Sequence, residues 1–126
     1  LLRNGDDGGS ITIISSVAGL KAMPAQASYS ASKFGLRGLA QTAAKELGDK
    51  RIRVNTVHPY AVNTPMGIAD SKAIEAFETW GMHFPSLLGH YPVADLDDLT
   101  EAVFYLASSR AVTGAEFQID MGHSKV

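Results

Sequence analysis

Three segments in the first half of the chain have regular spacings of apolar residues, and each spacing predicts one element. Ser10 to Ser16 is a short β-branched run bounded by turn residues, which is typical of a buried strand. Arg51 to Pro59 predicts a second strand. Between them, residues of one helical face recur every three or four positions from about Ala27 to Leu47, so this spacing predicts one long helix. The stripe of that helix comprises Tyr29, Lys33, Leu36, Ala40, Ala43 and Leu47.

The second half of the chain predicts a loop, two helices and a final strand. Tyr60 to Pro65 is a loop with two flanking prolines, and Ser71 to Met82 is weakly amphipathic and predicts a helix. Another helix begins at Asp95, because acidic residues occupy its first turn, where the helix dipole favours them. Ala115 to Ile119 predicts the last strand. Helical crossovers between short buried strands imply an α/β fold with a parallel sheet covered by helices.

Composition narrows the classes of function more than it narrows the fold. The 126 residues carry 11 basic and 13 acidic side chains without a basic patch, so nothing favours binding to nucleic acid or to an anionic membrane. The chain has no cysteine, which excludes disulfides and thiol nucleophiles, and its four histidines lack the spacing of metal ligands. We expect no metal site and no membrane span. The first residue is Leu1 and not Met, so a processed chain or a fragment is one interpretation.

Tyr29 and Lys33 are the first candidates for chemistry, because they lie one helical turn apart on the stripe that faces the core. A lysine there is unusual, since burying an ammonium group is costly unless it is paired. A tyrosine ordinarily titrates near ~10, and a neighbouring cation favours its phenolate, which would make Tyr29 a usable general acid or base. The alternative is an exposed tyrosine and lysine near the end of a helix.

Two further segments end at the same predicted edge of the sheet. Ser15 and Ser16 finish the first strand, where a hydroxyl group could hydrogen-bond a substrate oxygen. The loop that leaves the second strand near Pro59 could hold a flat polar ligand through its backbone and the Thr64 hydroxyl. The alternatives are a serine that satisfies the local backbone and an ordinary proline-rich connection.

These motifs together resemble the C-terminal half of a short-chain dehydrogenase/reductase. Gly9-Ser10-Ile11 leads to Ser16, and Tyr29-Ser30-Ala31-Ser32-Lys33 follows at the spacing typical of that family. The match continues through Arg53 to Pro59, Phe104 to Ser109, Val112 to Gly114 and Ile119 to Gly122. Within the family, the Thr-Pro-Met segment and the long apolar stretch after it resemble the carveol-dehydrogenase-like, mycofactocin-associated subgroup.

The resemblance implies a fold, a cofactor and a set of roles. The fold would be the C-terminal half of a Rossmann-type doubly wound parallel sheet, with three strands and helical crossovers. The cofactor would be NAD or NADP. Ser16 would orient the substrate oxygen, Tyr29 would give or take its proton, and Lys33 would tune Tyr29. Cofactor-binding residues would be Tyr29, Lys33, Pro59, Val62 and Thr64, and substrate-binding residues would be Ser16, Tyr60 and Met66.

Two departures from the family pattern bear on function. The usual glycine after Pro59 is Tyr60 here, whose ring could narrow or shift the pocket beside the nicotinamide. The family's glycine-rich phosphate-binding turn, which lies at a helix N-terminus, is not found in residues 1–126. We therefore expect residues 1–126 to form part of one NAD(P)-binding domain, without its glycine-rich half.

The same resemblance suggests the partners and the location. The apolar segment from Gly67 to Tyr91 would be the substrate lid and hints at a small apolar alcohol or ketone, although packing of the lid against the body would explain it equally well. Gly35, Gly38 and Thr42 leave one side of the 27–47 helix smooth. In the family that the chain resembles, the equivalent helix packs against its copy in a second subunit, so the resemblance implies a homodimer or homotetramer through this helix, in the cytoplasm. The alternative function is a non-catalytic remnant of the family that acts as an interaction module.

Overall fold

The computed structural model describes residues 8–66, 72, 75–76, 79–81 and 93–125, and it builds them around a parallel three-stranded sheet. The strands are β1 (Gly9–Ile14), β2 (Ile52–Pro59) and β3 (Glu116–Ile119), in the spatial order β1-β2-β3. The register pairs Gly9 with Ile52 and Thr56 with Glu116. The α/β class and the parallel sheet that the sequence predicts are thus confirmed.

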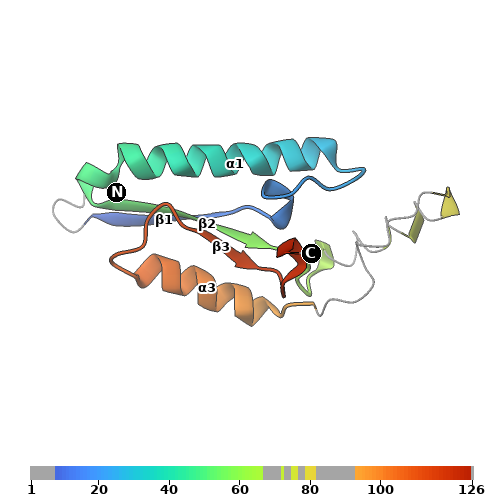
Figure 1. Ribbon diagram of the computed structural model, residues 1–126. Helices are drawn as coiled ribbons and strands as arrows, with labels where there is room; N and C mark the ends of the chain where they lie inside the picture. Colours follow the sequence, from blue (N-terminus) through green and yellow to red (C-terminus); the bar gives the residue numbers. More distant parts are fainter. Residues whose placement is uncertain (1–7, 67–71, 73–74, 77–78, 82–92, 126) are drawn as a thin grey trace.

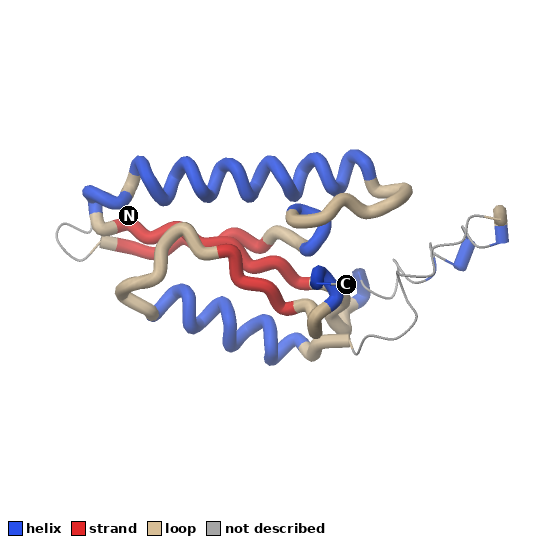
Figure 2. Tube along the Cα trace, viewed as in Figure 1, coloured by secondary structure: helices blue, strands red, loops and turns tan. Residues whose placement is uncertain are grey.

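Two helices cover opposite faces of the sheet (Figures 1 and 2). The long helix α1 (Ala27–Glu46) crosses one face, and α3 (Leu96–Ser108) lies across the other. Side chains alternate between the two faces along each strand, so Ile52 and Val54 of β2 point toward α1, where they form the core with Ala40. On α1 the half-buried and buried positions follow the predicted stripe, except that Tyr29 in the first turn is 40% exposed.

The Arg53 side chain points to the other face of β2, where it caps the C-terminal end of α3. Its guanidinium donates to the carbonyl oxygens of Leu106 (2.7 Å), Ala107 (2.8 Å) and Val112 (3.2 Å). The last carbonyl groups of a helix have no partner within the helix, and a cation near them is also favoured by the helix dipole. At its start, α3 has the capping box formed by Asp95 and Asp98.

Most element bounds agree with the spacing of apolar residues, and β1 is the main difference. The predicted strand runs to Ser16, whereas β1 ends at Ile14, because Ser16 caps a short 3-10 helix, η2 (Val17–Gly19). Two more 3-10 turns, η3 (Gly48–Lys50) and η4 (His123–Lys125), complete the described elements. The helix predicted from Ser71 to Met82 and the apolar stretch after it lie largely outside the described residues. None of the described helices combines the length and the apolar character of a membrane span.

Candidate active site at the carboxyl edge of the sheet

Ser15 and Ser16 form a turn directly after β1, and both are buried, with 3% and 8% of their surface exposed. The Ser15 amide donates to the carbonyl of Val57 at 2.8 Å, which continues the pairing with β2 by one residue. Ser16 has an extended backbone, and its Oγ accepts a hydrogen bond from the amide of Ala18 at 3.1 Å. This cap uses a lone pair and leaves the hydroxyl proton to donate to another oxygen. The serine therefore satisfies the local backbone, and its hydroxyl still has a donor to offer.

Gly19 allows this turn to lie directly against α1. A Cβ at this position would come within 2.6 Å of Ser15 Oγ and 2.8 Å of the Lys33 carbonyl oxygen, distances that real Cβ atoms do not reach. The Ser15 hydroxyl in turn donates to the Lys33 carbonyl at 3.1 Å. The backbone of Lys33 is thus held against the end of β1 from two sides.

The side chain of Lys33 reaches the same place. Its Nζ donates to the carbonyl oxygen of Ile14 at 3.2 Å and lies 5.5 Å from the centroid of the Tyr29 ring. This separation is within the range of cation–π attraction, so the ammonium group and the ring stay associated. Ser16, Tyr29 and Lys33 therefore come from the end of β1 and from the first two turns of α1, which pack against each other. The structure brings the three predicted catalytic residues to one edge of the sheet.

The loop after β2 supplies the remaining predicted residues. Pro59 is buried at the end of the strand, and the amide of Tyr60 donates to the Ile119 carbonyl at 3.1 Å. The Tyr60 ring stacks on the His123 ring, with centroids 3.7 Å apart and an interplanar angle of 13°. The predicted bulky ring beside the pocket is thus packed on the C-terminal turn.

Farther along that loop, Val62 pairs with Ala94 in an isolated parallel bridge that ties the loop to the segment just before α3. The Thr64 hydroxyl lies 3.4 Å from the Val62 carbonyl oxygen. Met66 is 69% exposed, and it is the predicted site residue farthest along the loop. The loop therefore leaves the same edge of the sheet as the serine turn.

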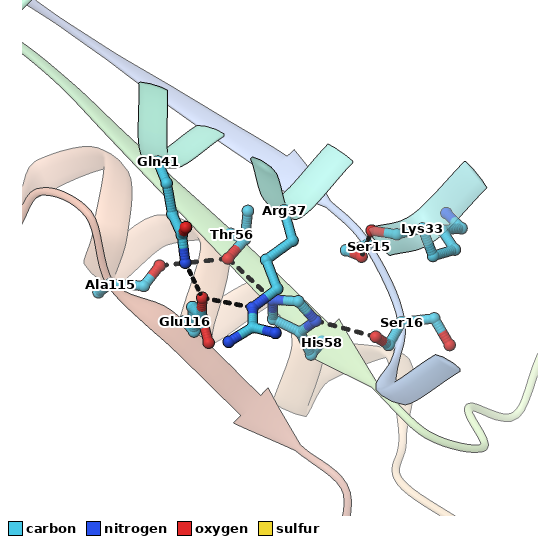
Figure 3. Close-up of polar contacts among 9 residues, drawn as sticks. All are labelled: Ser15, Ser16, Lys33, Arg37, Gln41, Thr56, His58, Ala115 and Glu116. Atoms are coloured by element: carbon cyan, nitrogen blue, oxygen red, sulfur yellow. Dashed lines mark hydrogen bonds and ion pairs between the residues drawn. The ribbon is translucent and has the colours of Figure 1, made fainter. Parts of the chain in front are cut away.

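Sequence reasoning missed the polar residues beneath this edge. Asn55, Thr56 and His58 are at most 1% exposed on β2. Figure 3 shows His58 between the main chain of Ser16 and the side chain of Thr56. Burial lowers the pKa of His58, outweighing a backbone hydrogen bond with Ser16 that raises it. The alternation of β2 could have placed His58 on the buried face, but it gives no sign of the partner.

A second polar group joins α1 to β3 on the same face (Figure 3). Arg37 Nε and Gln41 Nε2 each donate to Oε1 of Glu116 at 2.6 Å. The hydrogen bond from Arg37 is the main cause that holds the pKa of Glu116 below its ordinary value. Within the described residues, no group of three histidine, aspartate or glutamate side chains could hold a metal ion.

Comparisons with known proteins agree with the fold. A family model described as enoyl-(acyl carrier protein) reductase matches residues 1–124. An uncharacterized NAD-dependent oxidoreductase of Mycobacterium tuberculosis is 39% identical over 129 residues, covering 94% of this chain and 45% of that protein.

Two crystal structures are similar in both sequence and fold. A short chain dehydrogenase from Mycobacterium paratuberculosis bound to NAD has a TM-score of 0.83 and 43% identity, covering 94% of this chain and 46% of its own. Carveol dehydrogenase from Mycobacterium avium in complex with NAD has a TM-score of 0.80 and 36% identity, covering 94% and 47%. The chain thus spans about half the length of the relatives it matches.

Proposed function

Because this chain belongs to the short-chain dehydrogenase/reductase family, we propose that it carries the catalytic residues of an NAD-dependent oxidoreductase acting on an alcohol or ketone. The observation that supports this most directly is the convergence of Ser16, Tyr29 and Lys33 at one edge of the sheet. Similar proteins are named as NAD-dependent or were crystallised with NAD, which favours NAD over NADP here.

The residues at this edge fit a nicotinamide cofactor by the chemistry of their donors. Lys33 Nζ has three donor protons and uses one on the carbonyl of Ile14, which leaves donors for ribose hydroxyl groups. The Thr64 hydroxyl and the backbone at Val62 offer polar groups for a carboxamide, and Pro59 offers an apolar wall. When bound, the cofactor supplies or takes the hydride.

The protein's own residues handle the oxygen and its proton. We propose that the Ser16 hydroxyl donates to the substrate oxygen and fixes its position, since its cap to Ala18 uses only a lone pair. Tyr29 then gives a proton to that oxygen during reduction and takes it during oxidation. The Lys33 ammonium beside the ring stabilises the phenolate formed when Tyr29 gives up its proton.

Replacing the tyrosine hydroxyl tests this function. In the complete product of the reading frame that contains this sequence, we expect Tyr29→Phe to lower kcat by roughly 10²–10⁴-fold, the usual contribution of a general acid or base. Binding of NADH, measured by fluorescence titration, should change little. Tyr105→Phe is the matched control, because that tyrosine lies on α3 and is 51% exposed.

Turnover is measured by nicotinamide absorbance with NAD and with NADP, on a panel of apolar secondary alcohols and ketones. A similar protein is named for an alcohol, carveol, which makes cyclic alcohols the first members of the panel. Equal rates for the wild type and Tyr29→Phe would refute the mechanism. Absence of turnover with every member of the panel would favour the non-catalytic interaction module. The cytoplasmic location stays a prediction.

We also propose that the outward face of α1 joins two copies of the chain. Phe34 is 40% exposed and Leu39 is 59% exposed on this helix, and a Cβ added at Gly35 or Gly38 would meet nothing within 4 Å. Leu39→Glu should therefore lower the molar mass measured by sedimentation equilibrium. Phe104→Glu, on α3, is the control that should leave the mass unchanged. If only the Phe104 variant dissociates, the interface lies on α3 and not on α1, and the proposal is refuted.

A further inference from the structure

His58 is fully buried, yet both of its ring nitrogens have hydrogen-bond partners (Figure 3). Nδ1 lies 2.9 Å from the carbonyl oxygen of Ser16, and Nε2 lies 2.8 Å from the Thr56 hydroxyl oxygen. The bond to Ser16 joins residues 42 positions apart in the sequence. The side chain therefore links the end of β2 to the turn after β1.

Chemistry fixes which nitrogen carries the proton. A carbonyl oxygen only accepts, so Nδ1 must donate to Ser16. Burial favours the neutral ring, in which Nε2 then accepts from the Thr56 hydroxyl. The single hydroxyl proton of Thr56 goes to this 2.8 Å contact in preference to the Ala115 carbonyl oxygen at 3.3 Å. In a protonated ring, Nε2 donates to Thr56 and the Thr56 proton moves to Ala115, while the bond to Ser16 remains.

Each charged group around His58 has a partner of its own. Arg37 on α1 pairs with Glu116 on β3 at 2.6 Å, and Lys33 on α1 donates to the end of β1 at 3.2 Å. Glu116 favours a protonated His58, whereas Arg37 and Lys33 oppose it. Oε1 of Glu116 accepts from both Arg37 and Gln41, and the two hydrogen-bond partners of His58, the Ser16 carbonyl and the Thr56 hydroxyl, are neutral.

The serine turn has local bonds that shape it and long-range bonds that place it. The amide of Ala18 donates to Ser16 Oγ and the amide of Gly19 donates to the Ser16 carbonyl at 2.9 Å, which closes the turn on itself. These bonds would survive if the whole turn shifted. At Ser16 itself, the bond from His58 to the carbonyl oxygen anchors the turn to the sheet.

We propose that His58 is a positioning residue that holds the Ser16 carbonyl and thereby fixes where the Ser16 hydroxyl meets the substrate. This inference rests on the proposed catalytic role of Ser16. A displacement of about 1 Å at a reacting group can cost about 10²-fold in rate, so one lost bond beneath the turn has a measurable effect on turnover.

Two substitutions separate the donor from the volume of the ring. His58→Leu fills the site with apolar atoms and leaves no buried polar group orphaned, because Thr56 can donate to Ala115 and Ser16 keeps the Gly19 amide. His58→Asn carries an amide nitrogen at the position of Nδ1 and can still donate to Ser16. In the complete enzyme, we expect His58→Leu to lower kcat by roughly 10- to 100-fold with a KM and a cofactor Kd near those of the wild type. His58→Asn should restore kcat to within about threefold.

A double-mutant cycle distinguishes positioning from a general structural role. If His58 acts through Ser16, His58→Leu should change the residual rate of the Ser16→Ala enzyme by less than about twofold. Equal fold losses in the two backgrounds, or an asparagine variant as slow as the leucine variant, would overturn the inference. Should His58→Leu fail to fold, His58→Gln takes its place, because its amide reaches toward Thr56 and not toward Ser16.

A measurement without turnover keeps this inference separate from the proposed function. Because the Ser15 amide donates to the Val57 carbonyl at 2.8 Å and so joins the turn to β2, its hydrogen exchange should be roughly five- to tenfold faster in His58→Leu and unchanged in His58→Asn. The Gly114 amide, bonded to Val54 at 2.8 Å, is the internal control. Unchanged exchange at Ser15 would overturn the inference and leave the proposed function intact. If Ser16→Ala and Tyr29→Phe both turn over at the wild-type rate, the proposed function is refuted independently of any His58 variant.

Discussion

Asn55 offers a sharp test of how the segment after α3 is held to the sheet. It is fully buried on β2, its Nδ2 donates to the Val112 carbonyl at 2.9 Å, and its Oδ1 accepts from the Ala115 amide at 3.0 Å. Together the two bonds fix residues 112–115 just before β3. Asn55→Ala removes both bonds and leaves the space of the amide group empty.

The magnitude follows from what each partner loses. The Val112 carbonyl keeps a 3.2 Å bond from Arg53, so its share of the cost is small. The Ala115 amide has no such substitute, and an orphaned buried donor costs about 1–3 kcal/mol. Adding the lost packing of the amide group, we expect Asn55→Ala to lower the free energy of unfolding by about 3 kcal/mol. This corresponds to a fall in Tm of roughly 6–12 °C for a domain of 150–250 residues.

Asn55→Asp gives the same position a pH-dependent readout. The carboxylate can still accept from the Ala115 amide, but it repels the Val112 carbonyl; once protonated, its hydroxyl can donate to that carbonyl. Measured against the wild type at each pH, the variant should therefore recover stability as the pH falls. Thermal unfolding followed by circular dichroism supplies the data. Asn63→Ala, at an exposed asparagine, is the control and should stay within about 0.5 kcal/mol. A loss below about 1 kcal/mol for Asn55→Ala would show that the two bonds do not hold the segment.

Two further predictions concern the serine turn and acid stability. Gly19→Ala should cost about 1–3 kcal/mol by urea unfolding and lower turnover, because its Cβ would press on the Lys33 carbonyl; Gly48→Ala, whose Cβ meets nothing within 4 Å, is the control. Since the pKa values of His58, Glu116 and Asp120 all lie below their ordinary values of 6.5, 4.5 and 3.8, the unfolded chain binds more protons. As the pH decreases, the free energy of unfolding should therefore decrease, first below about pH 6.5 and again below about pH 4.5. Glu116→Gln should flatten the second step, and a curve that rises on acidification would contradict the assigned directions.

The sequence predicts those parts of the fold that depend on spacing. The stripe from Lys33 to Leu47 and the β-branched run at the start of β1 depend only on which positions are apolar, and both elements form as expected. The end of β1 was wrong by two residues, because Ser16 caps a 3-10 turn, and local capping competes with strand pairing without changing the apolar pattern.

The site was predictable where it depends on short-range motifs and not where it depends on distant pairs. Tyr29 and Lys33 are one turn apart on a helix, so their proximity follows from the helix alone. The bond between His58 and Ser16 spans 42 residues and exists only after two strands are in register. An alternating pattern tells which face His58 occupies, but the partner of a buried polar group is set by three-dimensional packing.

The guanidinium of Arg53 has a consequence for the order in which the chain folds. A helix of 13 residues is marginal by itself in water, and the final turn of α3 depends on a side chain that belongs to β2. The helix α1 is longer, at 20 residues, and the bond that closes its C-terminal end is local, from the Leu47 amide to the Ala43 carbonyl. In pulse-labelling experiments during refolding, amide protection in the last turn of α3 should thus appear together with protection in β2, whereas α1 can gain protection earlier. One residue of a central strand would set the time at which a helix that ends more than 53 residues downstream is completed.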